Sequence, residues 1–240
     1  MLKGYGGKKT IFKKVSPDES AVQVGDEAIL YSNHVPTYIS TNRMLAATKI
    51  LNDINPDFIL LDDGFQDKSL FKDKNILMVN GARGFGNGLC LPAGPLRELI
   101  KPALKKAQFL IIVGDDKTKI KSMYKNMNID TLTASIKPLY VDKNKKYLAF
   151  SGIGNNQSFF DTLIDNNCTV PKTVEFPDHH FFSENDLNKL KKIASDNNLS
   201  LITTEKDFVR IPKEKRDGIE CLKVKIKLHN MDKFMHKLVN

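Results

Sequence analysis

Several short segments of this 240-residue chain carry side chains suited to phosphate or proton chemistry. One of them is DDGFQ at residues 62–66, in which Asp62 and Asp63 directly follow the apolar run at residues 58–61. Paired carboxylates at the end of a buried strand are suited to holding Mg²⁺, directly or through water. The same residues also fit an ordinary turn that ends a strand, because Asp-Gly pairs are common in turns. The residues by themselves leave both interpretations open.

A glycine-rich segment follows further along the chain. It reads GARGFGNG at residues 81–88 and continues as LPAGPLRE at residues 91–98. Glycines let a backbone approach a ligand closely, and the guanidinium groups of Arg83 and Arg97 can each make paired hydrogen bonds to phosphate or sugar oxygens. The spacing is not that of a GxGxxG dinucleotide loop, because Leu89 stands in place of the third glycine. The segment predicts an anion-binding loop or simply a flexible one.

Three shorter segments carry further polar groups. The His pair in DHH at residues 178–180 offers a general base, a metal ligand or a surface residue. The sequence VGDE at residues 24–27 holds Asp26 and Glu27 but is common in loops. The sequence TTEKD at residues 203–207 fits a polar cluster at a strand end, or a helix N-cap with an acidic first turn.

A phosphate-binding loop of the GxxxxGK[ST] type does not occur in the sequence. The segment GYGGKKT at residues 4–10 looks similar, but its glycine spacing differs and no apolar strand precedes it. Such a strand is needed to aim the amides of the loop at phosphates. We therefore do not interpret this segment as a phosphate loop.

Alternating strand and helix patterns must position these groups. Five short β-rich runs, each followed by a polar or glycine-containing turn, are typical of parallel strands: residues 58–61, 76–79, 109–113, 147–150 and 199–202. A helix is predicted over residues 42–53, and Ser183 with Asp186 resembles a capping box that opens a second one. The alternation predicts an α/β fold with a doubly wound, mostly parallel sheet, whose ligands lie beyond the C-terminal strand ends. The stretch 114–146 lacks periodicity and is expected to contain the join between two lobes.

Composition restricts the class of protein. Hydrophobic residues at 41% and charged residues at 27% are typical of a globular chain. Three widely spaced cysteines and the lack of a signal-peptide pattern predict a cytoplasmic protein without disulfide bonds. The net charge of +9 suits a polyanion or anionic headgroups, or reflects compositional drift towards Lys. Because the five arginines are scattered without interleaved aromatic residues, we expect no nucleic-acid partner.

Taken in order, these segments resemble the tetraacyldisaccharide 4′-kinase family, the lipid A 4′-kinases of Gram-negative bacteria. The resemblance covers nearly the whole chain. It comprises KGYGG at residues 3–7, VGDE at 24–27, Val35-Pro36 with Arg43, DDGFQ at 62–66, LPAGPLRE at 91–98, FSGIG at 150–154, Asp178-His179 and TTEKD at 203–207. It implies a kinase that transfers the ATP γ-phosphate to the 4′-hydroxyl of a tetraacyldisaccharide 1-phosphate, peripheral to the inner face of the inner membrane.

The resemblance also implies roles for single residues. Asp26 is expected to be the general base for the sugar hydroxyl, with His179 as its partner. Glu27 is expected to bind Mg²⁺, and Asp62 and Asp63 to act as Walker B-type acids beside ATP. A further set of residues is expected to contact phosphate or substrate oxygens: Arg43, Arg83 and Arg97.

The same resemblance implies an architecture and a departure from it. We expect residues 1–140 to form the remainder of a P-loop-type kinase core, and residues 141–240 a smaller C-terminal α/β lobe. Family members carry a membrane-associating helix, a strand and a phosphate loop ahead of the KGYGG segment, which here begins at residue 3. The first strand and the phosphate loop are therefore expected to be absent, and a separate N-terminal fragment is a possible partner. The alternative function is an inactive or split-gene remnant that binds the lipid A precursor without catalysis.

Overall fold

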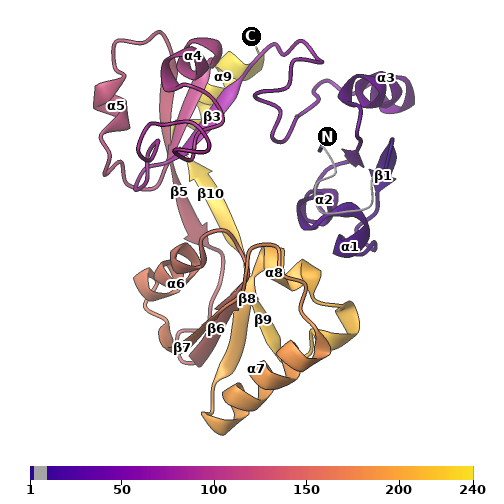
Figure 1. The fold of residues 1–240 in the computed structure, drawn as a ribbon, viewed down its shortest axis with the longest axis vertical. Coiled ribbons are helices and arrows are strands. Elements are labelled where there is room, and N and C mark those ends of the chain that lie inside the picture. Colours follow the sequence, from indigo (N-terminus) through magenta and orange to yellow (C-terminus); the bar gives the residue numbers. More distant parts are fainter. Residues whose placement is uncertain (3–9, 240) are drawn as a thin grey trace. The chain divides into compact units, whose positions relative to one another are not determined.

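The computed structural model describes residues 1–2 and 10–239 of the chain. The KGYGG segment at residues 3–7 lies outside the described residues. The chain divides into two compact units, each built from two segments: residues 1–64 with 138–223, and residues 65–137 with 224–240. Figure 1 colours these segments along the sequence. Each unit has its own sheet and core.

The first unit contains a four-stranded sheet in the order β7-β6-β8-β9, and all three pairings within it are parallel. Its strands alternate with helices in the chain, as parallel strands require. Their bounds are β6 (Lys146–Ser151), α6 (Asn156–Asp165), β7 (Thr169–Glu175), α7 (Glu184–Asp196), β8 (Ser200–Thr204), α8 (Glu205–Arg210), the 3₁₀ turn η1 (Lys213–Lys215) and β9 (Ile219–Leu222).

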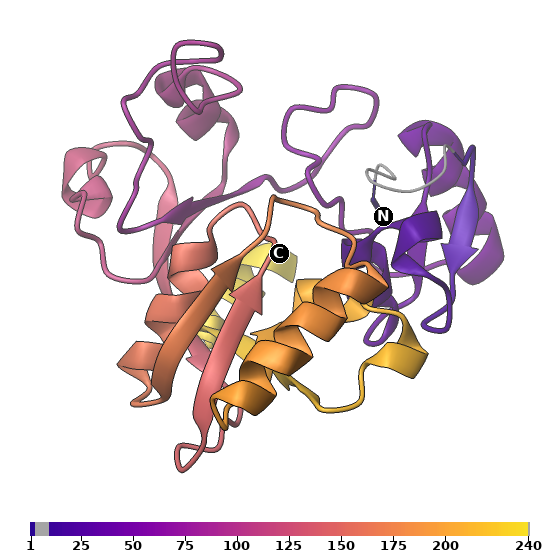
Figure 2. The same ribbon diagram turned by 60° about the horizontal axis from the view of Figure 1, so that its bottom comes forward.

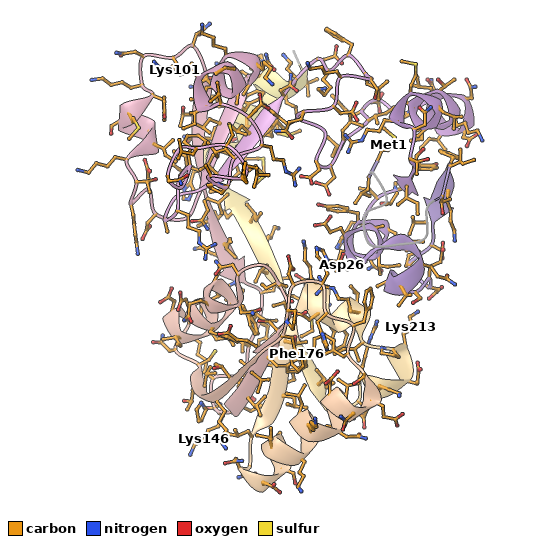
Figure 3. The ribbon with its side chains drawn as sticks, viewed as in Figure 1. Met1, Asp26, Lys101, Lys146, Phe176 and Lys213 are labelled. Atoms are coloured by element: carbon orange, nitrogen blue, oxygen red, sulfur yellow. The ribbon has the colours of Figure 1, made fainter. Side chains whose placement is uncertain are left out.

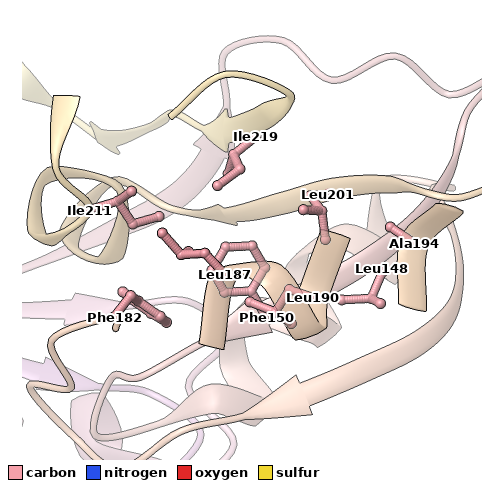
Figure 4. Close-up of a cluster of buried hydrophobic side chains, with 9 residues drawn as sticks. All are labelled: Leu148, Phe150, Phe182, Leu187, Leu190, Ala194, Leu201, Ile211 and Ile219. Atoms are coloured by element: carbon pink, nitrogen blue, oxygen red, sulfur yellow. The ribbon is translucent and has the colours of Figure 1, made fainter. Parts of the chain in front are cut away.

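Alternate residues of β6 supply the two cores of this sheet. Leu148 and Phe150 pack with Leu187 and Leu190 of α7 on one face (Figure 4). Tyr147 and Ala149, which point to the other face, pack in a separate cluster with side chains of α6. Both faces of the sheet are therefore covered by a helix (Figure 1, Figure 2), which explains why residues 147–150 of β6 are all buried rather than alternately buried and exposed.

The N-terminal segment of the same unit packs against this lobe. It contains β1 (Lys13–Val15), α1 (Ala21–Val24), α2 (Asp26–Ser32), β2 (Thr37–Ile39) and α3 (Arg43–Ile54), with β1 and β2 paired antiparallel. Val24 and Ala28 belong to a buried cluster against which Val209 of α8 packs. That contact brings the first turn of α2 to the C-terminal end of β8, where α8 begins.

The run at residues 58–61, predicted as a buried strand, does not form one. Residues 58–61 have no regular structure, and Phe58 and Leu60 are 56% and 68% exposed. The Met1 amino group donates to the Leu60 carbonyl, and the Asp62 N–H donates to the Met1 carbonyl. Among the described residues, these bonds to Met1 do not make the ladder of hydrogen bonds that defines a strand. Apolar composition predicted this element, but within residues 1–2 and 10–239 no neighbouring strand pairs with it.

The second unit contains a sheet in the order β10-β5-β4-β3, in which β3, β4 and β5 are parallel. Its elements are β3 (Ile76–Asn80), α4 (Ile100–Lys106), β4 (Phe109–Val113), α5 (Ile120–Met123), β5 (Asp130–Pro138), β10 (Val224–Leu228) and α9 (Met231–Val239). The aperiodic stretch 114–146 thus contains a nine-residue strand that the sequence did not indicate. Among the described residues, no helix is long and apolar enough to cross a membrane.

The predictions for most elements are confirmed. The runs at 76–79, 109–113, 147–150 and 199–202 correspond to β3, β4, β6 and β8, and the helix predicted over residues 42–53 is α3. The division into units differs from the predicted boundary at residue 140, because each unit is completed by a segment from the other half of the sequence. The chain does pass from one unit to the other inside the predicted stretch, at residues 137–138.

Candidate active site

Asp26 is the first residue of α2, and Figure 3 labels it there. Gly25 joins α1 to α2 with a φ of 90°, a conformation that strongly favours glycine. This sharp join lets α2 begin directly at the carboxylate. The Asp26 side chain is only 8% exposed, and its Oδ1 accepts the Glu27 N–H at 2.9 Å.

Arg210, the last residue of α8, holds the other oxygen of this carboxylate. Its Nε lies 2.8 Å from Asp26 Oδ2, and its Nη2 donates to the same oxygen. The two residues are 184 positions apart in the sequence. With its side chain 1% exposed, Arg210 forms a buried ion pair with Asp26.

A second buried carboxylate supports Arg210 from behind. Asp207 is fully buried, and its Oδ1 lies 3.1 Å from Arg210 Nη1. The same Oδ1 accepts the Gly152 N–H at 3.0 Å, and Oδ2 accepts the Thr204 hydroxyl at 2.7 Å. The Thr204 Oγ1 in turn caps α8 by accepting the Asp207 N–H. The N-cap interpretation of TTEKD is thereby confirmed, and the cap also orients the buried Asp207 carboxylate.

His179 lies beside the Asp26–Arg210 pair. Its Nδ1 is 3.6 Å from Asp26 Oδ2 and 3.3 Å from Arg210 Nη2, while the ring as a whole is 59% exposed. The backbone of His179 is held in the left-handed region, with φ at 59°, and its N–H donates to the Gly152 carbonyl at 3.0 Å. Non-glycine residues in this region are uncommon and are enriched at functional sites. The sharp turn therefore presents one polar, partly exposed ring to Asp26.

Gly152 is the point where these contacts meet. Its carbonyl accepts hydrogen bonds from His179 N–H and from Arg210 Nη1, and its N–H donates to Asp207. A Cβ at this position would lie 2.9 Å from the Pro177 carbonyl oxygen, so a larger residue would push the His179 turn away. The FSGIG segment thus acts as a backbone scaffold for the acid–histidine pair.

The electrostatics of the two carboxylates differ. Burial alone would raise the pKa of Asp26, but the hydrogen bonds and charge of Arg210, the Glu27 N–H and the charge of Lys206 outweigh it and hold that pKa below its usual range. For Asp207, burial dominates and raises the pKa despite Thr204, Gly152 and Arg210. Asp26 is therefore ionised at neutral pH, lies next to a histidine, and is able to accept a proton.

Glu27 and Lys206 form an ion pair at the edge of this arrangement. Lys206 Nζ lies 2.5 Å from Glu27 Oε1, and both side chains are about 40% exposed. The carboxylate predicted to bind Mg²⁺ therefore has a lysine as its partner in this state of the protein. The predicted metal role of Glu27 stays a prediction.

The DDGFQ segment forms a turn rather than the end of a strand. Arg43 is buried, and it donates to the backbone carbonyls of Asp62 at 2.5 Å and Asp63 at 3.3 Å. Gly64 is required here, because a Cβ would lie 2.5 Å from that of Leu61. Arg43, predicted to contact substrate, thus orients the turn that carries both acids.

Asp62 sits among like charges. Burial raises its pKa, and the negative charges of Glu27 and Asp63 raise it further. Carboxylate oxygens are the donors that Mg²⁺ prefers, and a cation would relieve this crowding. Among the residues that the structure describes, no three His, Cys, Asp or Glu side chains already form a metal-binding group. The donor chemistry fits a divalent cation, although the ligands are not assembled around one.

The other predicted residues lie elsewhere. Arg83 and Arg97 are exposed on the glycine-rich loop of the second unit, after β3, and their contact with substrate stays a prediction. His180 is structural: its Nε2 lies 3.1 Å from Asp186 and its ring stacks on Phe176 at 4.7 Å. Ser183 and Asp186 form the predicted capping box of α7. Of the two histidines, only His179 is next to Asp26.

The sequence analysis did not single out Arg210 or Asp207 as residues of this site. One signal was available: Asp207 and Arg210 are three residues apart on a helix that Thr204 caps, so both lie on one face. What the sequence did not indicate is that this face meets Asp26.

Comparisons with known proteins agree with the geometry. The family model described as "LpxK: Tetraacyldisaccharide-1-P 4'-kinase" matches residues 2–240. A tetraacyldisaccharide 4'-kinase of Rickettsia bellii is 36% identical over 241 residues, covering 99% of this chain and 74% of the relative. Those of Rickettsia akari and Gluconobacter oxydans are each 34% identical, covering 99% and 94% of this chain and 73% and 70% of the relatives.

One solved structure has a similar fold. The "apo" form of LpxK from Aquifex aeolicus, crystallised in complex with ATP, superposes with a TM-score of 0.76 at 24% identity, over 100% of this chain and 78% of that one. The predicted fold class, a P-loop-NTPase-like α/β protein with mostly parallel sheets, is confirmed by this likeness. The chain belongs to the tetraacyldisaccharide-1-P 4′-kinase family of lipid A biosynthesis.

Proposed function

We propose that this chain carries the acceptor side of a kinase that transfers the γ-phosphate of ATP to the 4′-hydroxyl of a tetraacyldisaccharide 1-phosphate, giving lipid IVA. The observation that supports this most directly is the Asp26 carboxylate, which is buried, ionised and 3.6 Å from His179. A carboxylate next to an imidazole can take the proton of an attacking hydroxyl and pass it on.

In the proposed reaction the 4′-oxygen forms a bond to the γ-phosphorus of ATP. The bond from that phosphorus to the β–γ bridging oxygen breaks, and its electron pair leaves with ADP. The hydroxyl proton goes to Asp26 and is then shared with His179, whose exposed edge can release it to water. Arg210 keeps Asp26 ionised before each turnover.

Mg²⁺ is part of the proposal, with Glu27 and Asp62 as the residues that would hold it. The crowding of negative charge around Asp62 supports this assignment, because it gives the cation a favourable place to bind. Bound there, the ion would neutralise charge on the phosphates of ATP. Asp63 shares the turn, and Arg43 fixes that turn through its backbone.

Two further parts of the proposal concern binding. Arg83 and Arg97, exposed on the glycine-rich loop, would contact phosphate or sugar oxygens of the substrate. The net charge of +9 would favour a peripheral position on an anionic inner-membrane surface. The alternative, a remnant that binds the lipid without transfer, has no contact among the described residues that favours it.

The test is phosphate transfer from γ-labelled ATP to the disaccharide 1-phosphate in mixed micelles. One arm uses residues 1–240 alone, and a second adds the N-terminal portion of the Rickettsia akari relative, since the sequence contains no GxxxxGK[ST] loop. We expect labelled lipid in at least the second arm. In Asp26→Asn the rate of phosphate transfer should fall by about 10³-fold. The control, Asp18→Asn, removes an exposed carboxylate and should keep activity. Folded protein that transfers no phosphate in either arm would overturn the proposal.

A further inference from the structure

Arg210 is the most completely bonded polar side chain at the site, although it reacts with nothing itself. A guanidinium has five N–H donors. Here they form two hydrogen bonds to Asp26 Oδ2 and one each to His179 Nδ1, Asp207 Oδ1 and the Gly152 carbonyl. These partners come from the N-terminal segment, the β6–α6 turn, the loop before α7, and α8 itself.

Burying this cation is expensive unless its charge and its hydrogen bonds are satisfied. Two buried carboxylates satisfy it, so Arg210 cannot rotate without breaking several contacts together. A planar fork also fixes direction in a way that a lysine ammonium does not. The arrangement is therefore suited to setting the angle of a carboxylate as well as its charge.

The two oxygens of Asp26 are consequently different. Oδ2 receives both Arg210 bonds, whereas Oδ1 receives the Glu27 N–H. Oδ1 thus keeps a lone pair for a further hydrogen bond. Because a guanidinium only donates, its contact with His179 also requires Nδ1 to be an acceptor, which places the proton of the neutral ring on Nε2.

We propose that Arg210 is a positioning residue of the phosphate transfer: it holds Oδ2 of Asp26 so that Oδ1 takes the proton of the sugar hydroxyl, and its hydrogen bond to His179 Nδ1 holds the ring beside Asp26. Asp207 and the Gly152 carbonyl fix Arg210 for this purpose. The inference rests on the kinase function proposed above.

A first experiment tests the placement without requiring activity. The chain has only five arginines, so its arginine side-chain NMR spectrum is simple. We expect Arg210 to show an Nε–H that exchanges slowly with water and a guanidinium that rotates slowly, and its loss in Arg210→Lys distinguishes this signal from that of the buried Arg43. In Asp26→Asn this signal should exchange at least about tenfold faster. An unchanged signal in Asp26→Asn would overturn the proposal.

A second experiment measures transfer in the arm that shows activity. Arg210→Ala should lower kcat by about 100-fold with little change in KM for the lipid, because it misplaces the base rather than the substrate. Arg210→Lys, which keeps the charge without the fork, should stay well below wild type. Guanidinium ion added to Arg210→Ala, at concentrations far below those that unfold the protein, should restore part of kcat, and methylammonium should not.

The matched control is Arg216→Ala. Arg216 lies just beyond α8, donates to the carbonyls of Ile211 and Val209 and packs on Phe208. Within the described part of the chain it makes no hydrogen bond to Asp26. It should keep kcat. Equal kcat values for the Arg210 and Arg216 variants would overturn the inference, as would equal rescue by the two cations.

The two proposals fail separately. If wild type transfers no phosphate in either arm, the kinase function fails, and the NMR signal still decides whether Asp26 fixes Arg210. If Arg210→Ala does not fold, the Arg210→Lys variant decides: wild-type kcat in that variant would overturn the positioning role.

Discussion

Asp26 and Asp62 are two acids of the same unit whose surroundings are opposite. Asp26 is buried against the guanidinium of Arg210, which lowers its pKa. Asp62 lies on an irregular turn, where burial and the charges of Glu27 and Asp63 raise its pKa. The fold thus gives Asp26 a buried counter-charge, whereas at Asp62 burial and the repulsion from Glu27 and Asp63 outweigh the attraction of Lys206. In the reaction that we propose, Asp26 belongs to the acceptor side of the site and Asp62 to the donor side.

The largest loss of stability is expected from a substitution of Asp207, which binds Arg210 and thereby supports Asp26 but not Asp62. Asp207→Ala leaves the buried Arg210 Nη1 and the Gly152 N–H without this acceptor. We expect the free energy of unfolding to fall by about 3–5 kcal/mol, as when one partner of a buried ion pair is removed. Urea unfolding measures it. Asp217→Ala is a matched exposed control, and a loss no larger than in that control would contradict the buried network.

The second prediction tests the ion pair at Asp26 itself. Asp26→Asn removes the charge that Arg210 binds but keeps the size of the side chain, so we expect a loss of about 2 kcal/mol in unfolding free energy. The same measurement on Asp18→Asn should give a change near zero, because that carboxylate is 88% exposed. A more stable Asp26→Asn protein would mean that burial, and not Arg210, dominates at this position.

The third prediction concerns Asp186, whose ionised form is stabilised by residues close to it in the sequence rather than by distant ones. Hydrogen bonds from the Ser183 hydroxyl and N–H, and from His180, lower the pKa of Asp186 to about 2. Ser183→Ala removes the cap of α7 and should cost about 1 kcal/mol. Because the pKa is lowered on folding, this carboxylate stabilises the protein above its ordinary value of 3.8 and stops doing so as pH falls from about 4 to about 2.

Unfolding curves of wild type and Ser183→Ala between pH 7 and pH 2 check that sign. The difference between the two proteins should narrow in the acid range, and turnover at neutral pH should stay the same. A difference that widens as pH falls would show that the cap does not act through ionised Asp186.

The smallest effect is expected at Asp62, and its sign is opposite. Asp62→Asn relieves repulsion from Glu27 and Asp63 while keeping an oxygen that can accept the Asp63 N–H. We expect a gain in unfolding free energy of less than about 1 kcal/mol without Mg²⁺. Thermal unfolding measures it, with Asp67→Asn as the neighbouring control. A clear loss of stability would mean that Asp62 already has a counter-charge, which would remove the contrast with Asp26.

The sequence predicted some of the contacts at the site but not others. Asp26 and His179 were expected to be partners because of the family resemblance, and they lie 3.6 Å apart. Their catalytic roles remain predictions. Arg43 was expected at the substrate, yet it holds the backbone of the DDGFQ turn, because a buried arginine must find acceptors within the fold.

The sequence by itself determined the local elements and the family. The apolar run of β4, the helical spacing of α3 and the Ser183–Asp186 box follow from patterns within a few residues. Tertiary structure decided whether the run at residues 58–61 became a strand, since a ladder needs a neighbouring backbone. It also decided that Arg210 meets Asp26 across 184 positions. The spacing of residues in the sequence indicates helical or strand periodicity and helix caps. The contact between α2 and α8, however, exists only because the sheet and the cluster around Val24 bring the two helix ends together.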